Sequence, residues 1–438
     1  MGIVNGLRKV QTFRALRHRN FRYLWMGQVG HAGALWMDQV ARAVLILQLT
    51  GSALALSLVI AVRLLPILLF GLLAGAIADR TDRKKLLLGT QCVTLSTHLF
   101  LGIAVVAGFV EAWHVFATAF VAGTAMAFNQ PVRQSLIPMT VGREDLLNAV
   151  ALNSTAVSLM RIGGGALAGV LLIPFSAGGV YLVTAGVYVY VTVTTLMLRL
   201  PPREGPPRKQ QSIAADLAEG FRYIRARPNL GIVTVLALIL FIFAFPFQQV
   251  FVPLLATRTL ELGDSGVGFL AGATGAGAVL GSLVIATRGS VRRPGLQLMI
   301  NMIVLGAALI LISLQSTVWG TALLLAVAGS MTVTYMAFTN SILLDNSSPE
   351  MHGRVMSLLS LDRGLIPVGS ILAGVLVSSI GVRPGLFVLG AIVLSLSVLA
   401  LLVWGRRLAA IRTSFGQPES AHAETPGAPA TESGHARR

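Results

Sequence analysis

The sequence predicts an all-α membrane protein with twelve transmembrane helices arranged in two six-helix bundles. Three observations support this fold class. Hydrophobic residues make up 55% of the 438-residue chain and charged residues only 12%, so the chain has too little polar surface to coat a soluble globule of its size. Apolar runs long enough to cross a bilayer recur along the chain, and the second half repeats motifs of the first. The two halves therefore predict one architecture used twice.

Charges, prolines and glycines separate the chain into twelve apolar runs. A helix needs about 20 apolar residues to cross the roughly 30 Å hydrocarbon core of a bilayer, and these runs reach that length. The predicted spans are 23–49, 53–79, 86–108, 113–138, 146–173, 177–199, 229–255, 265–287, 296–315, 318–342, 355–379 and 384–405.

The basic residues between the spans predict the orientation of the chain. Lys and Arg gather on the cytoplasmic side of membrane loops. With the N-terminus in the cytoplasm, most of the 34 Lys and Arg residues fall in cytoplasmic segments, and only Arg258 and Arg383 fall in loops on the opposite side. Both termini are therefore predicted to be cytoplasmic. The same distribution accounts for the net charge of +17 without a nucleic-acid partner.

A polar, proline-rich segment from Pro201 to Arg227 interrupts the apolar rhythm and leaves six spans on each side. The predicted organisation is a cytoplasmic arm (1–22), a first bundle (23–199), a cytoplasmic linker (200–228), a second bundle (229–405) and a tail (406–438). The Ala, Pro, Glu, Ser and Gly content of the tail predicts disorder.

The two halves share motifs at a nearly constant offset. Met126-Ala127-Phe128 recurs as Met336-Ala337-Phe338, and the sequence GGALAGVL from Gly164 recurs as GSILAGVL from Gly369. A parallel repeat of six spans with a long linker is typical of transporters in which two bundles move around a central site.

The strongest local motif lies where the second span meets the cytoplasm. Residues 75–84 read GAIADRTDRK, which follows the pattern Gly-x-Leu-Ala-Asp-Arg-x-Gly-Arg-Lys with Ile77 in place of the leucine and Asp82 in place of the second glycine. Together with the repeated six-span halves, this motif resembles the signature of the major facilitator superfamily. The resemblance covers the chain from about Arg14 to Arg407, and it implies the major facilitator fold and secondary transport.

Further motifs resemble the twelve-span drug–proton antiporter branch of this superfamily, which includes macrolide exporters and the enterobactin exporter. These motifs are Arg19-Asn20-Phe21-Arg22, Thr50-Gly51-Ser52 and Gly353-Arg354-Val355-Met356-Ser357. The fifth-span pattern Arg-x-x-Gly-Pro-x-x-Gly-Gly departs from that branch, because Gly165 replaces the proline. The resemblance implies an exporter that works by proton antiport and alternating access, and the departure at Gly165 counts against the antiport.

The junction at the end of the second span predicts a gate latch. Asp79 ends this span, where a carboxylate can face the positive N-terminal end of a helix across the bundle interface, here the eleventh span beginning near Arg354. The alternative is that the charges of this loop only fix the topology. The expected members of the latch are Gly75, Asp79, Arg80, Arg83 and Arg133.

Ionisable side chains within spans are costly in a bilayer and therefore suggest function. Asp38, near the middle of the first span, is the only acid at mid-depth in the first half. We expect it to pair with Arg161 of the fifth span or with Arg42 one helical turn away. An aspartate that moves between an ion pair and a water-filled cavity changes its proton affinity, which a proton-coupled antiporter needs. The alternative is a permanent structural pair with Arg42.

Two further charged residues are coupling or cavity candidates. Arg63 in the second span is expected to line the cavity or to pair across the bundles, and the alternative is that it reaches the outer surface. Asp362 in the eleventh span is the second coupling candidate, with a structural pair to Arg363 as the alternative. The excess of arginines over acids at mid-depth favours an anionic or polar neutral substrate.

Three uncharged candidates complete the predicted site. His98 in the third span, and Gln248 and Gln249 after an aromatic run in the seventh span, are candidate substrate contacts, with packing as the alternative for each. The sequence contains no ATP-binding Gly-Lys-Ser/Thr loop, metalloprotease motif or plausible catalytic triad. It predicts a protein that is not an enzyme and has no cofactor and no bound metal.

The sequence therefore predicts a monomeric bacterial inner-membrane protein that exports a small molecule in exchange for protons, with the lipid bilayer as its surroundings. An uptake carrier or uniporter of the same fold is one alternative. A membrane sensor or scaffold that does not transport is another, and the retained intramembrane charges count against it.

Overall fold

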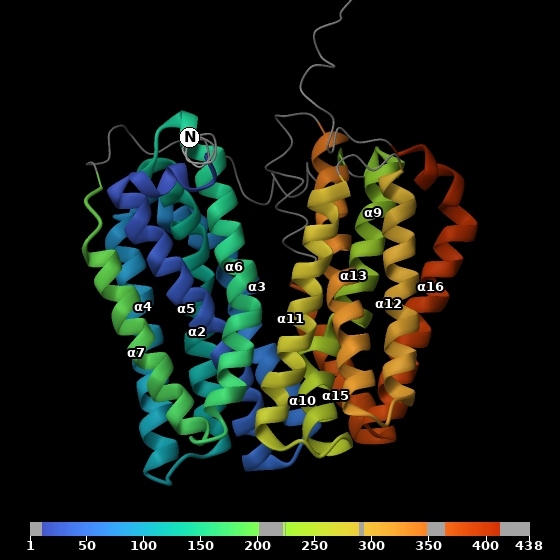
Figure 1. Ribbon diagram of the computed structural model, residues 1–438, viewed down its shortest axis with the longest axis horizontal. Coiled ribbons are helices and arrows are strands. Elements are labelled where there is room, and N and C mark those ends of the chain that lie inside the picture. The colour runs from blue at the N-terminus through green and yellow to red at the C-terminus, as the bar shows by residue number, and fades with distance from the viewer. Residues whose placement is uncertain (1–10, 201–221, 224, 289–292, 348–363, 412–438) are drawn as a thin grey trace, which may run out of the picture.

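The computed structural model describes residues 11–200, 222–223, 225–288, 293–347 and 364–411. In this part of the chain every regular element is helical (Figure 1). A helix satisfies its own backbone hydrogen bonds, which is required of a segment that lies in lipid.

The first half of the chain forms six long helices behind a short 3-10 helix, η1 (Gln11–Arg17). The turn η2 (Arg143–Asp145) precedes the fifth of them. The long helices are α2 (Arg19–Thr50), α3 (Ala53–Arg80), α4 (Arg83–Val106), α5 (Ala112–Thr140), α6 (Leu146–Leu171) and α7 (Ala177–Leu196).

The second half begins with an irregular span and continues with regular helices. The irregular span consists of α9 (Pro228–Ile239), η3 (Leu240–Ala244), η4 (Phe247–Phe251), α10 (Val252–Leu254) and η5 (Leu255–Thr259). The regular helices are α11 (Gly263–Arg288), α12 (Pro294–Leu314), α13 (Val318–Asp345), α15 (Ile366–Ile380) and α16 (Val382–Ala410).

Three π-helical segments, η3, η4 and η5, interrupt the seventh span. In a π-helix each N–H bonds five residues back, as Phe245 does to Leu240 at 2.7 Å. Pro246 and Pro253 lie in the same stretch, and a proline cannot donate the α-helical bond. The sequence predicted one regular helix here, because hydropathy reports the length of a span and not its hydrogen-bonding pattern.

The helices correspond in order to the twelve predicted spans. Among the described residues, nine helices are long and apolar enough to cross a membrane. Several extend beyond the predicted limits, since α2 begins at Arg19 and α16 ends at Ala410. The eleventh helix, α15, is described only from Ile366, so the start of its predicted span at residue 355 lies outside the described residues. Most of the linker and tail lies outside them as well, and the predicted disorder of the tail stays a prediction.

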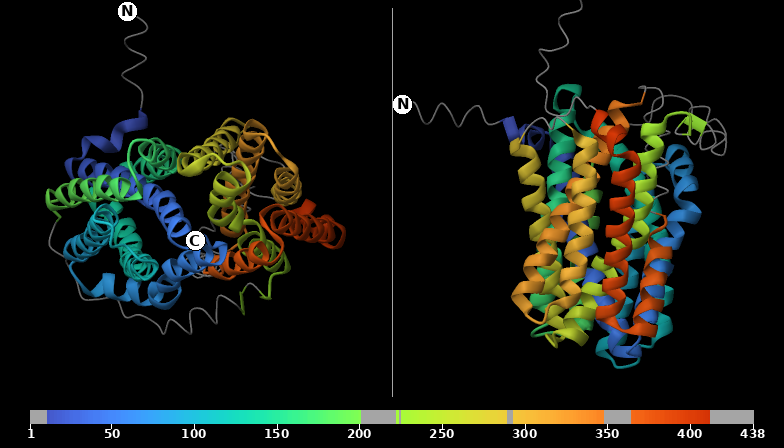
Figure 2. Two further views of the ribbon diagram at one scale, coloured as in Figure 1. Left: turned by 90° about the horizontal axis from the view of Figure 1, so that it is seen from below. Right: turned by 90° about the vertical axis from the view of Figure 1, so that its right-hand side faces the viewer.

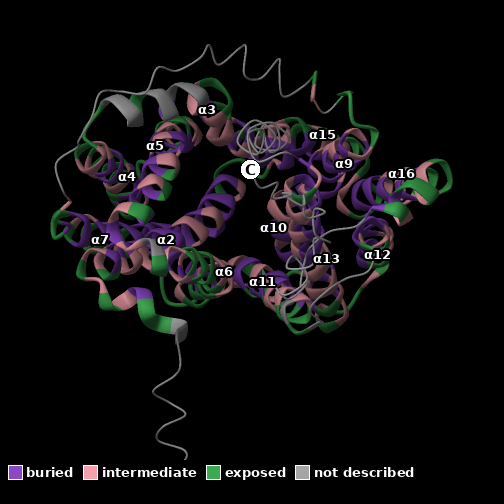
Figure 3. Ribbon diagram, turned by 90° about the horizontal axis from the view of Figure 1, so that it is seen from above, coloured by how far each residue is buried: buried purple, intermediate pink, exposed green. Residues whose placement is uncertain are grey.

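The helices form two groups, α2 to α7 and α9 to α16, which lie next to each other with their long axes roughly parallel (Figures 1 and 2). The groups meet where α6 packs on α11 and where α3 packs on α15. Figure 3 shows that buried residues gather where helices face one another. We call the end that carries η1 and the α3–α4 turn the inner end, and the opposite end the outer end.

Close helix contacts repeat between the two halves. A Cβ atom at Gly123 of α5 would overlap the carbonyl oxygen of Arg63 in α3, and one at Gly329 of α13 would overlap the carbonyl oxygen of Thr274 in α11. Only glycine allows two helix backbones to approach so closely. The fourth span thus packs on the second as the tenth packs on the eighth, which agrees with the repeat seen in the sequence.

The two halves touch at an outer seam, which we define as the contacts of Gly169 with Gly268 and of Ser57 with Gly374. A Cβ at Gly169 would lie 2.7 Å from the Cα of Gly268, and a Cβ at Gly374 would lie 2.6 Å from the Cβ of Ser57. These contacts are equivalent in the repeat, because Gly169 and Gly374 occupy the same position of the repeated motif. Larger side chains would therefore push the halves apart at this point.

Two polar contacts strengthen the outer end. Gln48 Nε2 at the end of α2 donates to Asp264 Oδ2 of α11 at 2.6 Å. Arg258 of η5 donates to the carbonyl oxygen of Gly51. Both bonds join the first half to the second, so the outer end is held together by polar as well as by glycine contacts.

At the inner end, polar side chains of α2 and α4 tie these helices to the end of α7. Asn20 donates to the carbonyl oxygen of Arg199 at 2.7 Å and accepts from its N–H at 3.1 Å. Lys84 Nζ donates to the carbonyl oxygens of Leu196 and Leu198 at 2.8 and 2.7 Å, where a cation satisfies the end of a helix. This accounts for Asn20 and Lys84 as parts of the motifs found in the sequence.

Candidate functional site

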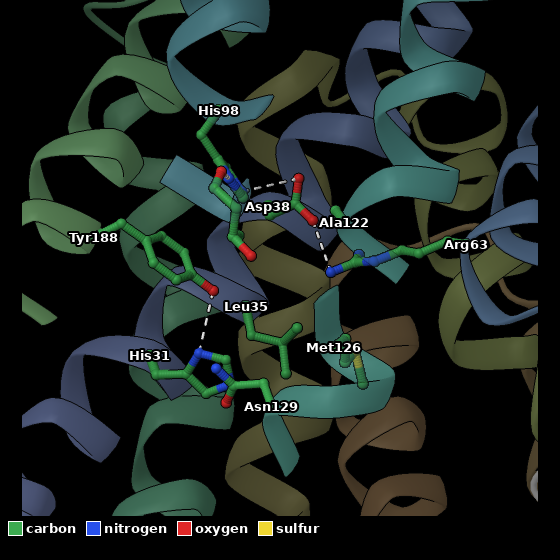
Figure 4. A pocket seen from close by; sticks show the side chains of 10 residues that line it. His31, Leu35, Asp38, Arg63, His98, Ala122, Met126, Asn129 and Tyr188 are labelled. Carbon is green, nitrogen blue, oxygen red and sulfur yellow. Dashed lines mark hydrogen bonds and ion pairs between the residues drawn. The ribbon is translucent and has the colours of Figure 1, made fainter. Parts of the chain in front are cut away.

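A buried carboxylate, Asp38 of α2, is the centre of the candidate site (Figure 4). Asp38 is 1% exposed. Its Oδ1 accepts from Arg42 Nη2 at 2.8 Å, and its Oδ2 lies 2.7 Å from Arg63 Nη2 of α3. One acid therefore faces two arginines from different helices, an arrangement that needs close pairing because a single buried charge is expensive.

Arg42 is fixed inside the first bundle. Its Nη1 donates to the carbonyl oxygen of Val115 and to Thr118 Oγ1, both at 3.1 Å, and its guanidinium lies 5.8 Å from the centre of the Tyr181 ring. The Arg42 side chain is only 3% exposed. Helix α5 therefore holds this arginine independently of Asp38.

Arg63 is held less tightly than Arg42. Its side chain is 14% exposed, and the close approach of α5 at Gly123 fixes its backbone. From there the side chain reaches across to Asp38, within its own bundle (Figure 4). Arg63 thus borders a small cavity inside the first bundle, and its acid partner belongs to the same bundle and not to the other one. Its place in a transport cavity stays a prediction.

Aromatic and histidine side chains form the other side of the site. His98 Nδ1 bonds to the carbonyl oxygen of Thr94 at 2.6 Å, and its Nε2 lies 3.4 Å from Asp38 Oδ1. The His98 ring stacks on Tyr188 with 5.3 Å between centroids. The Tyr188 hydroxyl and His31 Nδ1 are hydrogen-bonded at 3.1 Å. This places His98 in the Asp38 cluster, at the same carboxylate oxygen that accepts from Arg42.

A small cavity lies beside these groups. It measures about 10 Å³ and is bordered by Asp38, Arg63, His98, Asn129 and Tyr188 among others. A polar cavity of about one water-probe volume can hold a single water. The site is therefore compact, with room for one water between the carboxylate and its neighbours.

A second polar layer lies on the inner side of the Asp38 cluster. Asn129 donates to Thr90 Oγ1 at 2.9 Å, and Arg133 Nε donates to Asn129 Oδ1 at 3.4 Å. Arg133 is 4% exposed, and a Cβ at Gly27 would lie 3.6 Å from its Nη1. Within the described part of the chain, neither Nη1 nor Nη2 of Arg133 has a hydrogen-bond partner. Arg133 thus lies inside the first bundle.

The remaining latch residues lie at the inner end. Gly75, Asp79 and Arg80 belong to the last turns of α3, and their side chains lie outside the described part of the structure. Arg83 Nη1 of α4 lies 3.5 Å from the carbonyl oxygen of Ser135 and 3.0 Å from Met139 Sδ. The latch stays a prediction.

Arg161 does not join the Asp38 cluster among the described residues. Its guanidinium lies 5.7 Å from the centre of a Trp36 ring. Helices α2 and α6 both run from the inner to the outer end and touch at Gly33 and Gly164. Arg161 precedes that contact while Asp38 follows it, so the two lie at different depths. The structure thus brings Asp38 together with Arg42 and Arg63 instead.

The candidates in the second half lie apart from this cluster. Gln248 and Gln249 are half-buried in the π-helical segment η4. Phe245, which precedes them, packs with Phe241 at 5.7 Å between ring centroids. Leu64 of the first bundle packs against the same apolar cluster. Asp362 lies outside the described residues.

Three further members of the site, His31, Tyr181 and Tyr188, were not predicted from the sequence. One signal was available, because His31, Leu35, Asp38 and Arg42 repeat every three or four residues and so share one face of α2. No such signal pointed to the tyrosines, since their proximity to Asp38 depends on how α7 packs on α2 and α4.

Removal of one hydroxyl tests the aromatic side of the site. We expect Tyr188→Phe to lower the free energy of unfolding by about 1–3 kcal/mol, because it leaves the buried His31 without its bond. Thermal unfolding of the purified protein measures this change. Tyr190→Phe is the matched control, because Tyr190 is 43% exposed. Equal melting temperatures for the two variants would contradict the assigned bond.

Comparison with known proteins identifies the family. The model of the major facilitator family described as "Transmembrane secretion effector" matches residues 10–424. Macrolide efflux protein A of Streptococcus pyogenes is 22% identical over 86% of this chain and 94% of its own length. The multidrug efflux pump Tap of Mycolicibacterium fortuitum is 26% identical over 81% and 88%. The enterobactin exporter EntS of Shigella dysenteriae is 27% identical over 52% and 54%.

Solved structures support the same fold. A POT family transporter in complex with a thioalcohol-conjugated peptide matches with a TM-score of 0.73 at 12% identity, over 89% of this chain and 96% of that chain. A bacterial homologue of the lysosomal transporter Spinster in an inward-facing, unoccupied conformation matches with a TM-score of 0.60 at 18% identity, over 92% and 96%. The family and the fold are those of transporters and not of enzymes. The chain is a multi-pass membrane protein and belongs to the transmembrane secretion effector family of the major facilitator superfamily.

Proposed function

We propose that the protein exports a small molecule in exchange for protons, with the Asp38 carboxylate as the proton carrier. The observation that supports this proposal is the burial of Asp38 between Arg42 and Arg63. Protonation of Asp38 would leave two arginines without a counter-charge inside the bundle, a state that a low-dielectric interior disfavours strongly. The bundle must then rearrange, which couples the proton to a conformational change.

Arg63 is the arginine that we expect to move. Arg42 is held by α5 in addition to Asp38, whereas Arg63 is the more exposed of the two. Release of Arg63 from a protonated Asp38 would move a positive charge within the first bundle, beside the small cavity that Arg63 borders. This step supports alternating access, in which the outer seam opens while the inner end closes.

The relatives support export as the direction. Their names describe efflux of macrolides, efflux of several drugs and export of enterobactin. We propose a substrate of that range, drug-like, macrolide-like or siderophore-like, in a monomeric protein of the bacterial inner membrane with both termini in the cytoplasm. The basic side chains at the inner end, among them Lys84 and Arg227, support this orientation.

Inverted membrane vesicles test the proposed exchange. A pH gradient is established across the vesicles, and a macrolide, a cationic drug or a siderophore is then added. We expect at least one of these compounds to dissipate the gradient in vesicles that contain the protein and not in vesicles without it. Substrate accumulation that leaves the gradient unchanged would identify a carrier without proton exchange.

The latch at Asp79 is proposed as part of the same cycle. We expect Asp79→Asn to reduce transport at least tenfold without reducing membrane insertion, because loss of the charge removes its attraction to a helix N-terminus across the interface. Efflux from cells, compared at equal amounts of inserted protein, measures the effect.

Asp82→Ser is the matched control for Asp79→Asn. Asp82 caps α4 by accepting from the N–H groups of Lys84 and Lys85, and serine keeps that cap while removing the charge. If both variants lose transport equally, transport depends on the total negative charge of the α3–α4 loop. The proposed latch role of Asp79 would then be wrong.

A further inference from the structure

We propose that the inner end of the second bundle carries a binding site for the phosphate group of an anionic membrane lipid. The site is a cavity of about 490 Å³ where the start of α9, the end of α13 and the end of α16 come together. The helices that border it, α9, α13 and α16, belong to the second group (Figure 1), whereas the Asp38 cluster lies within the first.

Two arginines give the cavity its charge. Arg227 precedes α9, and Arg407 lies in the last turn of α16. The described lining residues are Ala226, Arg227, Pro228, Asn229, Leu230, Asn346, Arg407 and Ala410, and none of these is acidic. Arginine binds phosphate oxygens in a fork geometry with several donors. The chemistry of the lining therefore fits a phosphate monoanion or dianion.

Arg227 is held in position for this role. Its Nη1 donates to the carbonyl oxygen of Asn346 at 2.8 Å, and its guanidinium lies 4.2 Å above the ring of Tyr223. A guanidinium has five N–H donors, so the bond to Asn346 leaves others for a ligand. The nearby Asp345 accepts a hydrogen bond from Ser341 at 3.3 Å, one turn back along α13.

The surroundings of the cavity favour a lipid as the source of the phosphate. The helix that carries Arg407 exposes apolar side chains just before it, with Leu402 78% and Val403 62% exposed. Such a face is expected to contact acyl chains. A basic pocket between helices at the membrane surface, directly beside an acyl-chain contact, is the arrangement that binds anionic headgroups.

Native mass spectrometry of the full-length protein with added phosphatidylglycerol tests the proposal. We expect Arg227→Gln/Arg407→Gln to weaken phosphatidylglycerol binding, on the order of fivefold for each arginine removed, because one basic side chain near an anionic surface contributes an attraction of that size. Phosphatidylcholine, which has no net charge, should bind more weakly to the unmodified protein than phosphatidylglycerol.

Arg383→Gln is the matched control. Arg383 lies at the opposite end of α16 and donates to the carbonyl oxygen of Gln315, the residue that caps α12, at 3.0 Å. Arg227 donates in the same way to Asn346, the residue that caps α13. Arg407→Gln alone keeps the Arg227 bond and serves if the double variant does not fold.

Two results would overturn the proposal. Equal phosphatidylglycerol binding by Arg227→Gln/Arg407→Gln and by Arg383→Gln would show that the cavity does not select anionic lipid. Displacement of the lipid by millimolar inorganic phosphate would identify a site for soluble phosphate instead. Neither result depends on transport, so the proposal can fail while the proposed exporter function stands.

Discussion

We expect Asp38→Asn to abolish proton-driven accumulation of substrate while leaving substrate exchange across the membrane measurable. The amide of asparagine is similar in size to the carboxylate but does not take up and release a proton at physiological pH. In the proposed exchange, accumulation against a gradient needs that proton, whereas exchange of substrate on the two sides needs only the conformational change. We therefore expect accumulation to fall by more than about tenfold, equivalent to roughly 1.4 kcal/mol or more of lost driving force. Proteoliposomes with and without an imposed pH gradient measure both activities.

The structural cost of Asp38→Asn must be separated from its effect on coupling. Loss of one partner from a buried charge pair costs about 3–5 kcal/mol, because Arg42 and Arg63 keep their charges. The double variant Asp38→Asn/Arg63→Gln reduces this imbalance and should recover thermal stability without recovering accumulation. Glu144→Gln is the control for loss of an exposed acid at the inner end. Normal accumulation by Asp38→Asn would exclude Asp38 as the proton carrier.

We expect Gly268→Leu to keep the outer end of the protein open. A Cβ at Gly268 would overlap the Cα of Gly169, which belongs to the other bundle. Backbone atoms on both sides cannot yield as a flexible side chain can, so the halves must separate at the seam. Transport should then stop, because a carrier that cannot close its outer end cannot complete its cycle.

Cross-linking across the outer end with a short bifunctional thiol reagent measures this opening. The side chains of Gln48 and Asp264 are hydrogen-bonded across the two halves, so cysteines at these positions should be bridged by such a reagent in the closed form. The native Cys92, the single cysteine of the chain, is first replaced by serine. Gly268→Leu should reduce the yield of cross-linked protein several-fold. Gly186→Leu is the matched control, because a Cβ at Gly186 meets nothing within 4 Å, and a similar yield in both variants would contradict the proposed role of the seam.

The fold could be predicted from the sequence because lipid imposes a simple rule on the chain. A span must be apolar over a fixed length, and this property is visible in the order of the residues. The π-helical segments of the seventh span were not visible, since Pro246 and Pro253 can be accommodated in more than one hydrogen-bonding pattern. Helix ends such as Arg19 were also misplaced, because helices continue into the polar layer where hydropathy no longer reports them.

The candidate site was only partly predictable. Asp38 stands out because a lone acid in an apolar span is rare, and Arg42 follows from helical spacing. The contact with Arg63 depends instead on how deeply α3 sits against α2 and α5, which Gly123 determines through a backbone contact. Arg161 was expected as a partner of Asp38 because both are charged residues within spans. The register of the parallel helices α2 and α6 places Arg161 at a different depth from Asp38. Depth and register are properties of packing, and one sequence does not reveal them.

The two hydrogen bonds between Asn20 and Arg199 bear on how the two halves arose and on whether they can be made separately. They bring the beginning and the end of the first six helices together at one face. The second six share this property, because Arg227 and Arg407 border the same cavity. A six-helix unit whose two ends lie close together can be duplicated in the gene without a change in the path of any helix. We therefore expect a chain cut between residues 201 and 221 to reassemble from two separately synthesised polypeptides.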